Sequence, residues 1–137
     1  MELALVLPVF LLLVFGIIDL GMVIWANDTI ANAAREGARY ASVTGNSQFT
    51  PTTSKADIRT RTQQFVIAGG QNIVVTVCYS AVTGTACSGN TDAPGAYNAR
   101  GALVTVRVSA TVPILTGSLL GLGSFAVSGT SSVLVNN

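Results

Sequence analysis

Two acids within a strongly apolar N-terminal segment are the residues of this sequence with the most distinctive chemistry. Glu2 precedes sixteen consecutive uncharged positions, residues 3–18, and Asp19 interrupts the apolar run before it resumes. A carboxylate at membrane depth costs roughly 2.5–3.5 kcal/mol on insertion scales and usually marks a functional position. We therefore expect Glu2 and Asp19 to meet polar partners during assembly of the protein.

Arg35 and Arg39 are the cations that Asp19 could meet. On a single helix they would stand about 24 to 30 Å from Asp19, at about 1.5 Å per residue, so the groups cannot touch within one chain. They could pair between two copies displaced along a common axis. The alternative is that Asp19 lies at the water boundary and forms hydrogen bonds locally.

Composition argues against catalysis and against nucleic-acid binding. The sequence has no histidine, only 9% of its residues are charged, and its net charge is +1. A general base near neutral pH or a nitrogen-ligated metal site has little to be built from. Nucleophile elbows, metal-ligand spacings and phosphate-binding glycine motifs are also missing. We expect no enzyme activity, no cofactor, no metal and no basic surface for phosphate.

Cys78 and Cys87 lie in a stretch rich in Gly, Ser and Thr. Such a pair is better explained by one structural disulfide outside the cytoplasm than by two idle thiols. All seven Lys and Arg follow residue 34, which by the positive-inside rule would place the body in the cytoplasm. The disulfide argues for the opposite side, so we expect a basic leader to have been removed from the precursor.

The N-terminal segment must be a helix if it is to position these acids. A helix over residues 3–26 would be about 36 Å long, enough to cross a bilayer core of about 30 Å. Pro8 is expected to bend it or loosen one turn. Gly16 and Gly21 permit close approach by a neighbouring helix, although single glycines are common in apolar helices.

The helix is expected to continue as an amphipathic segment over residues 27–43. One face of that segment carries mostly small side chains, among them Ala34, Gly37 and Ala38. The whole rod, residues 3–43, would be about 60 Å long, which is longer than a bilayer requires. A long rod with a small-residue stripe suggests lateral packing.

The remaining residues predict a small α+β body. Thr53 or Ser54 can begin a second helix that ends near residue 68. Alternating apolar residues predict antiparallel strands in a three- to four-stranded meander, with the middle one central, at residues 71–80, 102–112 and 125–135. The apolar loop between the last two either contacts another chain or folds under the sheet. We expect two domains: a helix over residues 1–43 and a globular part over residues 44–137.

Both ends of the sequence resemble the TadE-like pilins of tight-adherence (Tad) pili, a branch of the type IV filament superfamily. At the N-terminus the resemblance is carried by MELALVLPVFLLLVFGIIDLG and by the NAAREGAR segment, residues 32–39. At the other end it is carried by VTVRVSATVPILTGSLLGLGSFAVSGTSSV. Residues 45–101 are generic, so the resemblance covers about half of the chain.

The resemblance implies a prepilin that a membrane peptidase cuts upstream of a Glu, which Glu2 matches. It also implies an inner-membrane assembly platform, a membrane-held subunit before assembly, and a homo-oligomeric extracellular filament that attaches cells to surfaces. Within such a fibre we expect Glu2 to pair with the N-terminal amine of a neighbouring subunit. The alternatives are a minor, priming or tip pilin or pseudopilin, and a single-pass anchored extracytoplasmic binding domain.

Overall fold

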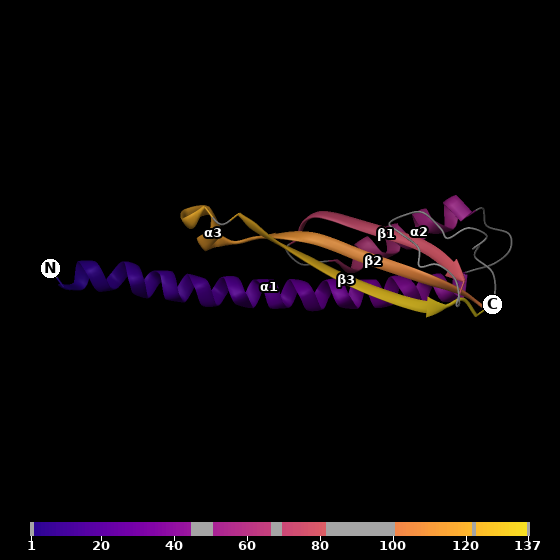
Figure 1. Cartoon of the computed structure of the whole chain (residues 1–137), viewed down its shortest axis with the longest axis horizontal. Helices are drawn as coiled ribbons and strands as arrows, with labels where there is room; N and C mark the ends of the chain where they lie inside the picture. The colour runs from indigo at the N-terminus through magenta and orange to yellow at the C-terminus, as the bar shows by residue number, and fades with distance from the viewer. Residues whose placement is uncertain (1, 45–50, 67–69, 82–100, 122, 137) are drawn as a thin grey trace.

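The computed structural model describes residues 2–44, 51–66, 70–81, 101–121 and 123–136. Among them the elements follow in the order α1, α2, β1, β2, α3, β3. They form two layers, because α1 and α2 both pack on an antiparallel sheet (Figure 1). The predicted α+β class, with a long apolar helix, a short helix and an antiparallel sheet, is confirmed.

Helix α1, Glu2–Thr44, is one helix of 43 residues, about 64 Å long at 1.5 Å per residue. It continues through Pro8. Proline lacks the amide that would bond to the carbonyl of residue 4, so the loss falls in the first turns of the helix. The sheet lies along the C-terminal part of α1, whereas the N-terminal part projects beyond it (Figure 1).

Helix α2 differs from its predicted bounds. It spans Pro51–Phe65 and therefore begins before Thr53 or Ser54 and ends before residue 68. Proline suits the first turn of a helix because the amide that it lacks has no intrahelical partner there. Residues 67–69, which include the predicted end of this helix, lie outside the described residues.

The sheet is a meander in which β2 is central, as predicted. Its strands are β1, Gln71–Ala81, β2, Ala102–Pro113, and β3, Ser124–Leu134. In the register, Val77 lies opposite Val106, and Val104 lies opposite Val133. The alternation that predicted these strands therefore places one set of valines on the face that the helices cover.

The core lies between that face and the helices. β2 contributes Val104, Val106 and Val108, all fully buried. α1 contributes small side chains and Ile30. The remaining buried members of the cluster come from all three strands, from α2 and from the residue after β3. They include Ile58, Val75, Val77, Tyr79, Ala110, Val112, Val127 and Val135.

A short helix, α3, stands where the sequence predicted an apolar loop. It spans Leu115–Leu120 and ends at Gly121, whose φ of +71° is the left-handed conformation that glycine adopts most readily. α3 lies against α1 rather than under the sheet. It is the part of the body nearest the projecting end of α1 (Figure 1).

Candidate assembly surface

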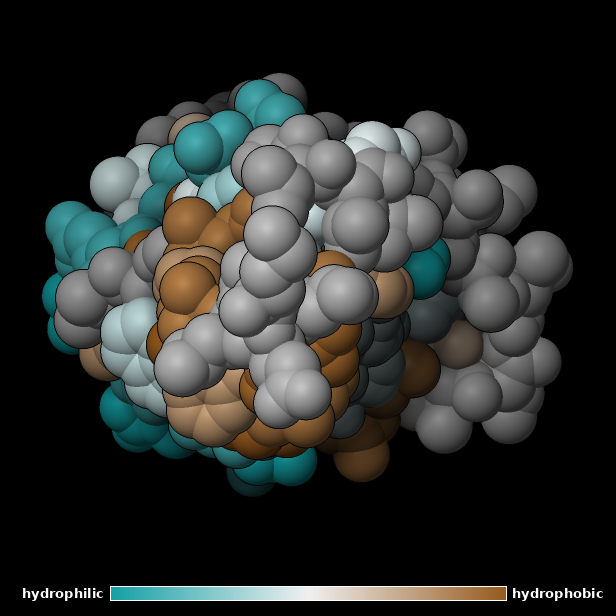
Figure 2. All heavy atoms as spheres, turned by 90° about the vertical axis from the view of Figure 1, so that its left-hand side faces the viewer, coloured by the Kyte–Doolittle hydropathy of each residue, from teal (hydrophilic) through white to brown (hydrophobic). Residues whose placement is uncertain are grey.

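The projecting part of α1 is an apolar rod that the other described elements cover only near Asp19, where α3 lies against it. Of the described residues, α1 alone is long and apolar enough to cross a membrane. From the N-terminal end, hydrophobic residues occupy the middle of the view (Figure 2). The exposed large hydrophobic side chains on this rod are Val6, Leu7, Val9, Phe10, Leu11, Leu12, Leu13, Phe15, Ile17, Ile18, Leu20, Ile24 and Trp25.

The predicted packing glycines of the rod are open. A Cβ atom added at Gly16 or Gly21 would meet nothing within 4 Å in the described chain. Both positions could therefore take the close approach of another helix. Glu2 is the first residue of α1, but its side chain lies outside what the structure describes, so its pairing with an amine stays a prediction.

Asp19 is the buried charge of the rod, and only 5% of it is exposed. Its carboxylate accepts hydrogen bonds of 2.9 Å from the backbone amides of Leu115 and Thr116. It also accepts one from the Thr116 hydroxyl. These donors stand at the start of α3, where the first amides of a helix have no intrahelical partner. α1 therefore caps α3 from 96 residues away in the sequence.

This capping contact decides what Asp19 does within one chain. The carboxylate hydrogen-bonds inside its own subunit, and its donors come from α3, a partner that neither of the two predicted alternatives named. Pairing with Arg35 or Arg39 of another copy stays a prediction. The missed partners are Leu115 and Thr116, and Pro113 before them and Gly121 after them were the sequence signals for a short helix.

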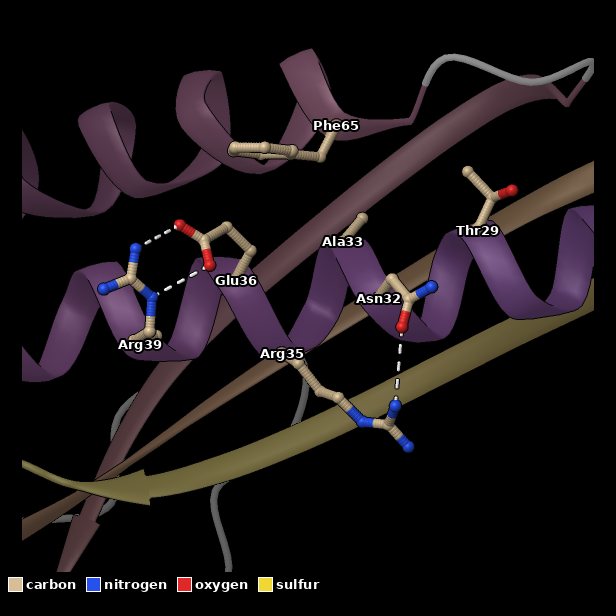
Figure 3. Close-up of a pocket in the computed structure, with 7 residues that line it drawn as sticks. All are labelled: Thr29, Asn32, Ala33, Arg35, Glu36, Arg39 and Phe65. Carbon is tan, nitrogen blue, oxygen red and sulfur yellow. Dashed lines mark hydrogen bonds and ion pairs between the residues drawn. The ribbon is translucent and has the colours of Figure 1, made fainter.

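Arg35 and Arg39 lie farther along α1 and point to different partners (Figure 3). Arg39 donates two hydrogen bonds to Glu36, of 2.9 and 2.7 Å. Arg35 donates one of 3.4 Å to Asn32. With Phe65 of α2 they border a hollow of about 520 Å³ (Figure 3). Both arginines are thus exposed but engaged with neighbours on their own helix.

Glu36 lies in the part of α1 that the body covers, beyond the apolar segment. Hydrogen bonds from Arg39 hold the pKa of the Glu36 carboxyl below its ordinary value. The pair is a surface ion pair at i,i+3 spacing, and such pairs contribute little to stability. It does set the charge pattern that another copy would meet, because the Arg39 charge is already partly compensated.

The small residues predicted for helix packing are covered by the chain itself. Ala34, Gly37 and Ala38 are buried in the described structure. At Gly37 an added Cβ would collide with the Thr62 hydroxyl of α2 and lie 3.2 Å from a methyl group of Val106. Their packing partners within one subunit are therefore α2 and the sheet. Packing of Gly16 and Gly21 against another subunit stays a prediction.

Gly129 in β3 plays a part that the sequence analysis missed. A Cβ there would lie 3.0 Å from the Ala31 Cα and 3.1 Å from the Ile30 carbonyl oxygen. The absence of a side chain lets the backbones of β3 and α1 approach closely. The signal was a lone glycine within an alternating strand pattern, which often marks close backbone approach.

The predicted disulfide falls partly outside the described residues. Cys78 is buried in β1 at 4% exposure, whereas Cys87 lies in the segment of residues 82–100 that the structure does not describe. The Cys78–Cys87 bond therefore stays a prediction.

Comparisons with known proteins give one match. No curated protein matches the chain. No solved structure matches it either. Residues 1–39 match the family model described as TadE-like protein. That segment includes Glu2, Asp19, Arg35 and Arg39, together with the predicted packing glycines. Over these residues the predicted resemblance to the TadE-like family is confirmed.

Proposed function

We propose that this chain is a structural subunit of an extracellular filament of the Tad type, without catalytic activity, in which N-terminal helices are bundled at the centre. The observation that carries the proposal is the uncovered apolar rod of α1 projecting from a folded body. The family match over residues 1–39, which associates the chain with the Tad pilus, supports it. Attachment of cells to surfaces is the biological role that we propose for the fibre.

Apolar burial alone does not favour the fibre over the membrane. Lipid and the interior of a helix bundle are about equally apolar, so helix association depends on close packing and on polar groups that find partners, each contributing about 0.5–2 kcal/mol. Gly16 and Gly21 offer the close packing, since no other part of the described chain occupies the space beside them. Glu2 offers the polar partner, through the amine of the next subunit.

Before assembly the same rod holds the subunit in the inner membrane. An apolar helix of this length is consistent with anchoring. We propose that a prepilin peptidase releases the leader there and that an assembly platform extracts the subunit into the growing fibre. The assembled location is then the cell surface.

The anchored binding domain remains the competing function. The length of α1 does not separate the two, because its second half lies within the core of the body and needs no filament to explain it. The two differ in what surrounds the first half. A filament subunit has copies of α1 around it, whereas an anchored domain has only lipid.

Imaging of material sheared from cells tests the proposal. We expect fibres that contain this chain, and Glu2→Gln should reduce their yield because an amide cannot pair as a charge with the amine. Asp28→Asn, an exposed acid on the same helix, is the matched control and should leave the yield unchanged. Wild-type fibre levels in Glu2→Gln would refute the role of Glu2.

The same material also decides between the main and the minor subunit. A main subunit dominates the mass of the fibre, whereas a priming or tip subunit occurs in traces on fibres built from another chain. If the chain purifies only as a single molecule in lipid or detergent, and no fibre contains it, the filament proposal is wrong.

A further inference from the structure

The β2–β3 connection and the strand ends beside it, described for residues 113–121 and 123–125, lie next to the apolar rod of α1. We call this region the tip. It touches α1 through the hydrogen bonds that Asp19 accepts from Leu115 and Thr116. Any position of α1 in a membrane therefore fixes the position of the tip.

The depth of Asp19 in a bilayer can be estimated by comparing the length of the apolar helix with the thickness of the hydrocarbon core. If Asp19 marked the water boundary, residues 3–18 would have to cross the bilayer with only about 24 Å of helix, against a core of about 30 Å. Leu20, Ile24 and Trp25, all exposed large hydrophobics, would then stand in water. Extending the span to residue 26 gives about 36 Å and places Trp25 at the interface, where tryptophan is enriched. Asp19 then lies about 9 Å inward from Trp25.

The tip has the uncharged, apolar surface that a position below the membrane interface requires. It contains no charged residue, and none occurs anywhere after Arg107. Its Leu115 and Phe125 side chains are 59% and 57% exposed. A mainly apolar hollow of about 400 Å³ lies between the tip and α1. Its lining residues are Leu13, Gly16, Ile17, Asp19, Leu20, Val23, Ile114, Thr116 and Phe125.

The polar groups where the tip meets α1 are hydrogen-bonded to each other, as polar groups inside a bilayer must be. Unpaired backbone amides and a lone carboxylate are both costly in hydrocarbon. The hydrogen bonds between the first amides of α3 and the Asp19 carboxylate lower the free-energy penalty of placing both groups in hydrocarbon. In water either group could be solvated instead.

We infer that, while α1 is anchored, the tip inserts into the acyl-chain region of the outer leaflet, and that an acyl chain of a phospholipid fills the hollow beside Phe125. The inference rests on the membrane-anchored state within the proposed function. It makes the subunit a two-point membrane binder, held by the rod and by the tip.

Fluorescence quenching in vesicles tests the insertion. The full chain is reconstituted into phosphatidylcholine–phosphatidylglycerol vesicles whose phosphatidylcholine is brominated on its acyl chains. The reporter is Phe125→Trp in a Trp25→Phe background, so that it is the single tryptophan. Leu115→Trp is a second reporter at the tip. Thr130→Trp, exposed on β3 about 17 Å farther along the strand, is the control.

We expect both tip reporters to lose emission in brominated vesicles about as strongly as Trp25 of the wild type, with the control nearly unaffected. If Trp25 is quenched but the tip reporters match the control, the tip inference is wrong and anchoring stands. If Trp25 is also unquenched, anchoring is wrong too. If the tip reporters are shielded from lipid increasingly as the protein-to-lipid ratio rises, a second copy covers the tip and the inference is overturned.

Discussion

The Asp19 side chain finds hydrogen-bond donors for its own carboxylate and at the same time supplies an acceptor to the first amides of α3. An acid within an apolar rod needs donors, and a six-residue helix needs an acceptor for its first amides. The fold brings the two together at 2.9 Å. The contact joins the ends of the chain, because α3 follows β2 near the C-terminus, whereas Asp19 is near the N-terminus.

Removing the Asp19 carboxylate should free α3. We expect Asp19→Ala to raise the hydrogen-exchange rates of the Leu115 and Thr116 amides by roughly tenfold or more, because these partly buried amides lose a charged acceptor. Asp19→Asn keeps one acceptor oxygen and should give a smaller increase. The measurement is exchange of the detergent-solubilised subunit, followed by mass spectrometry of peptides covering the tip.

The control for that experiment is Asp28→Ala, which removes an exposed acid from the same helix. It should leave the tip amides as protected as in the wild type. Equal exchange in Asp19→Ala and wild type would mean that α3 is held by other contacts.

At the scale of elements, α1 is one helix with two surroundings. Its first half is largely exposed apart from the contact of Asp19 with α3, whereas in its second half a stripe of small residues lets α2 and the sheet lie close to its backbone. Thr62 shows how tight this packing is. Its fully buried hydroxyl donates a 2.6 Å hydrogen bond to the Ile58 carbonyl and also faces Gly37.

Equivalent glycine substitutions in the two halves should therefore differ. Gly37→Ala forces Thr62 to move and to lose its bond to Ile58, and overpacking of this kind costs about 1–3 kcal/mol. Gly16→Ala meets no neighbour and should leave the free energy of unfolding unchanged or raise it by up to about 1 kcal/mol through helix propensity. Urea unfolding in detergent, followed by circular dichroism, measures both. Equal stabilities would show that the α1–α2 contact is looser than described.

Local patterns in the sequence predicted most of these elements. Alternating valines gave β2 and its central place, and uninterrupted apolar residues gave α1, since both signals depend on the period of one element. α3 could not be found that way, because six residues with an internal glycine hold too little periodicity. The helical pattern also could not predict what packs on the small-residue face of α1. Small residues such as Ala34 and Gly37 suit close packing against another copy and against the chain's own sheet equally well.

At the scale of the whole molecule, the apolar rod and the polar outer face of the sheet are separate surfaces. In the described residues, α2 and the sheet cover the small-residue face of α1, whereas an added Cβ at Gly16 or Gly21 of the rod meets nothing within 4 Å. The polar outer face of the sheet, with the exposed Arg107 on β2, points away from the helices. Copies packed rod to rod would therefore carry their bodies on the outside.

Bulk added to the rod should accordingly prevent assembly without unfolding the body. Gly16→Leu and Gly21→Leu add side chains at positions where a Cβ atom meets nothing of the described chain within 4 Å, although Gly16 also borders the hollow beside the tip. Close helix approach in a bundle depends on small residues, so we expect fewer sheared fibres from either variant. Thermal unfolding of the body should match the wild type, in contrast to Gly37→Ala. Normal fibres from both leucine variants would mean that these glycines face the periphery of the bundle, and that the rods meet along a different side of α1.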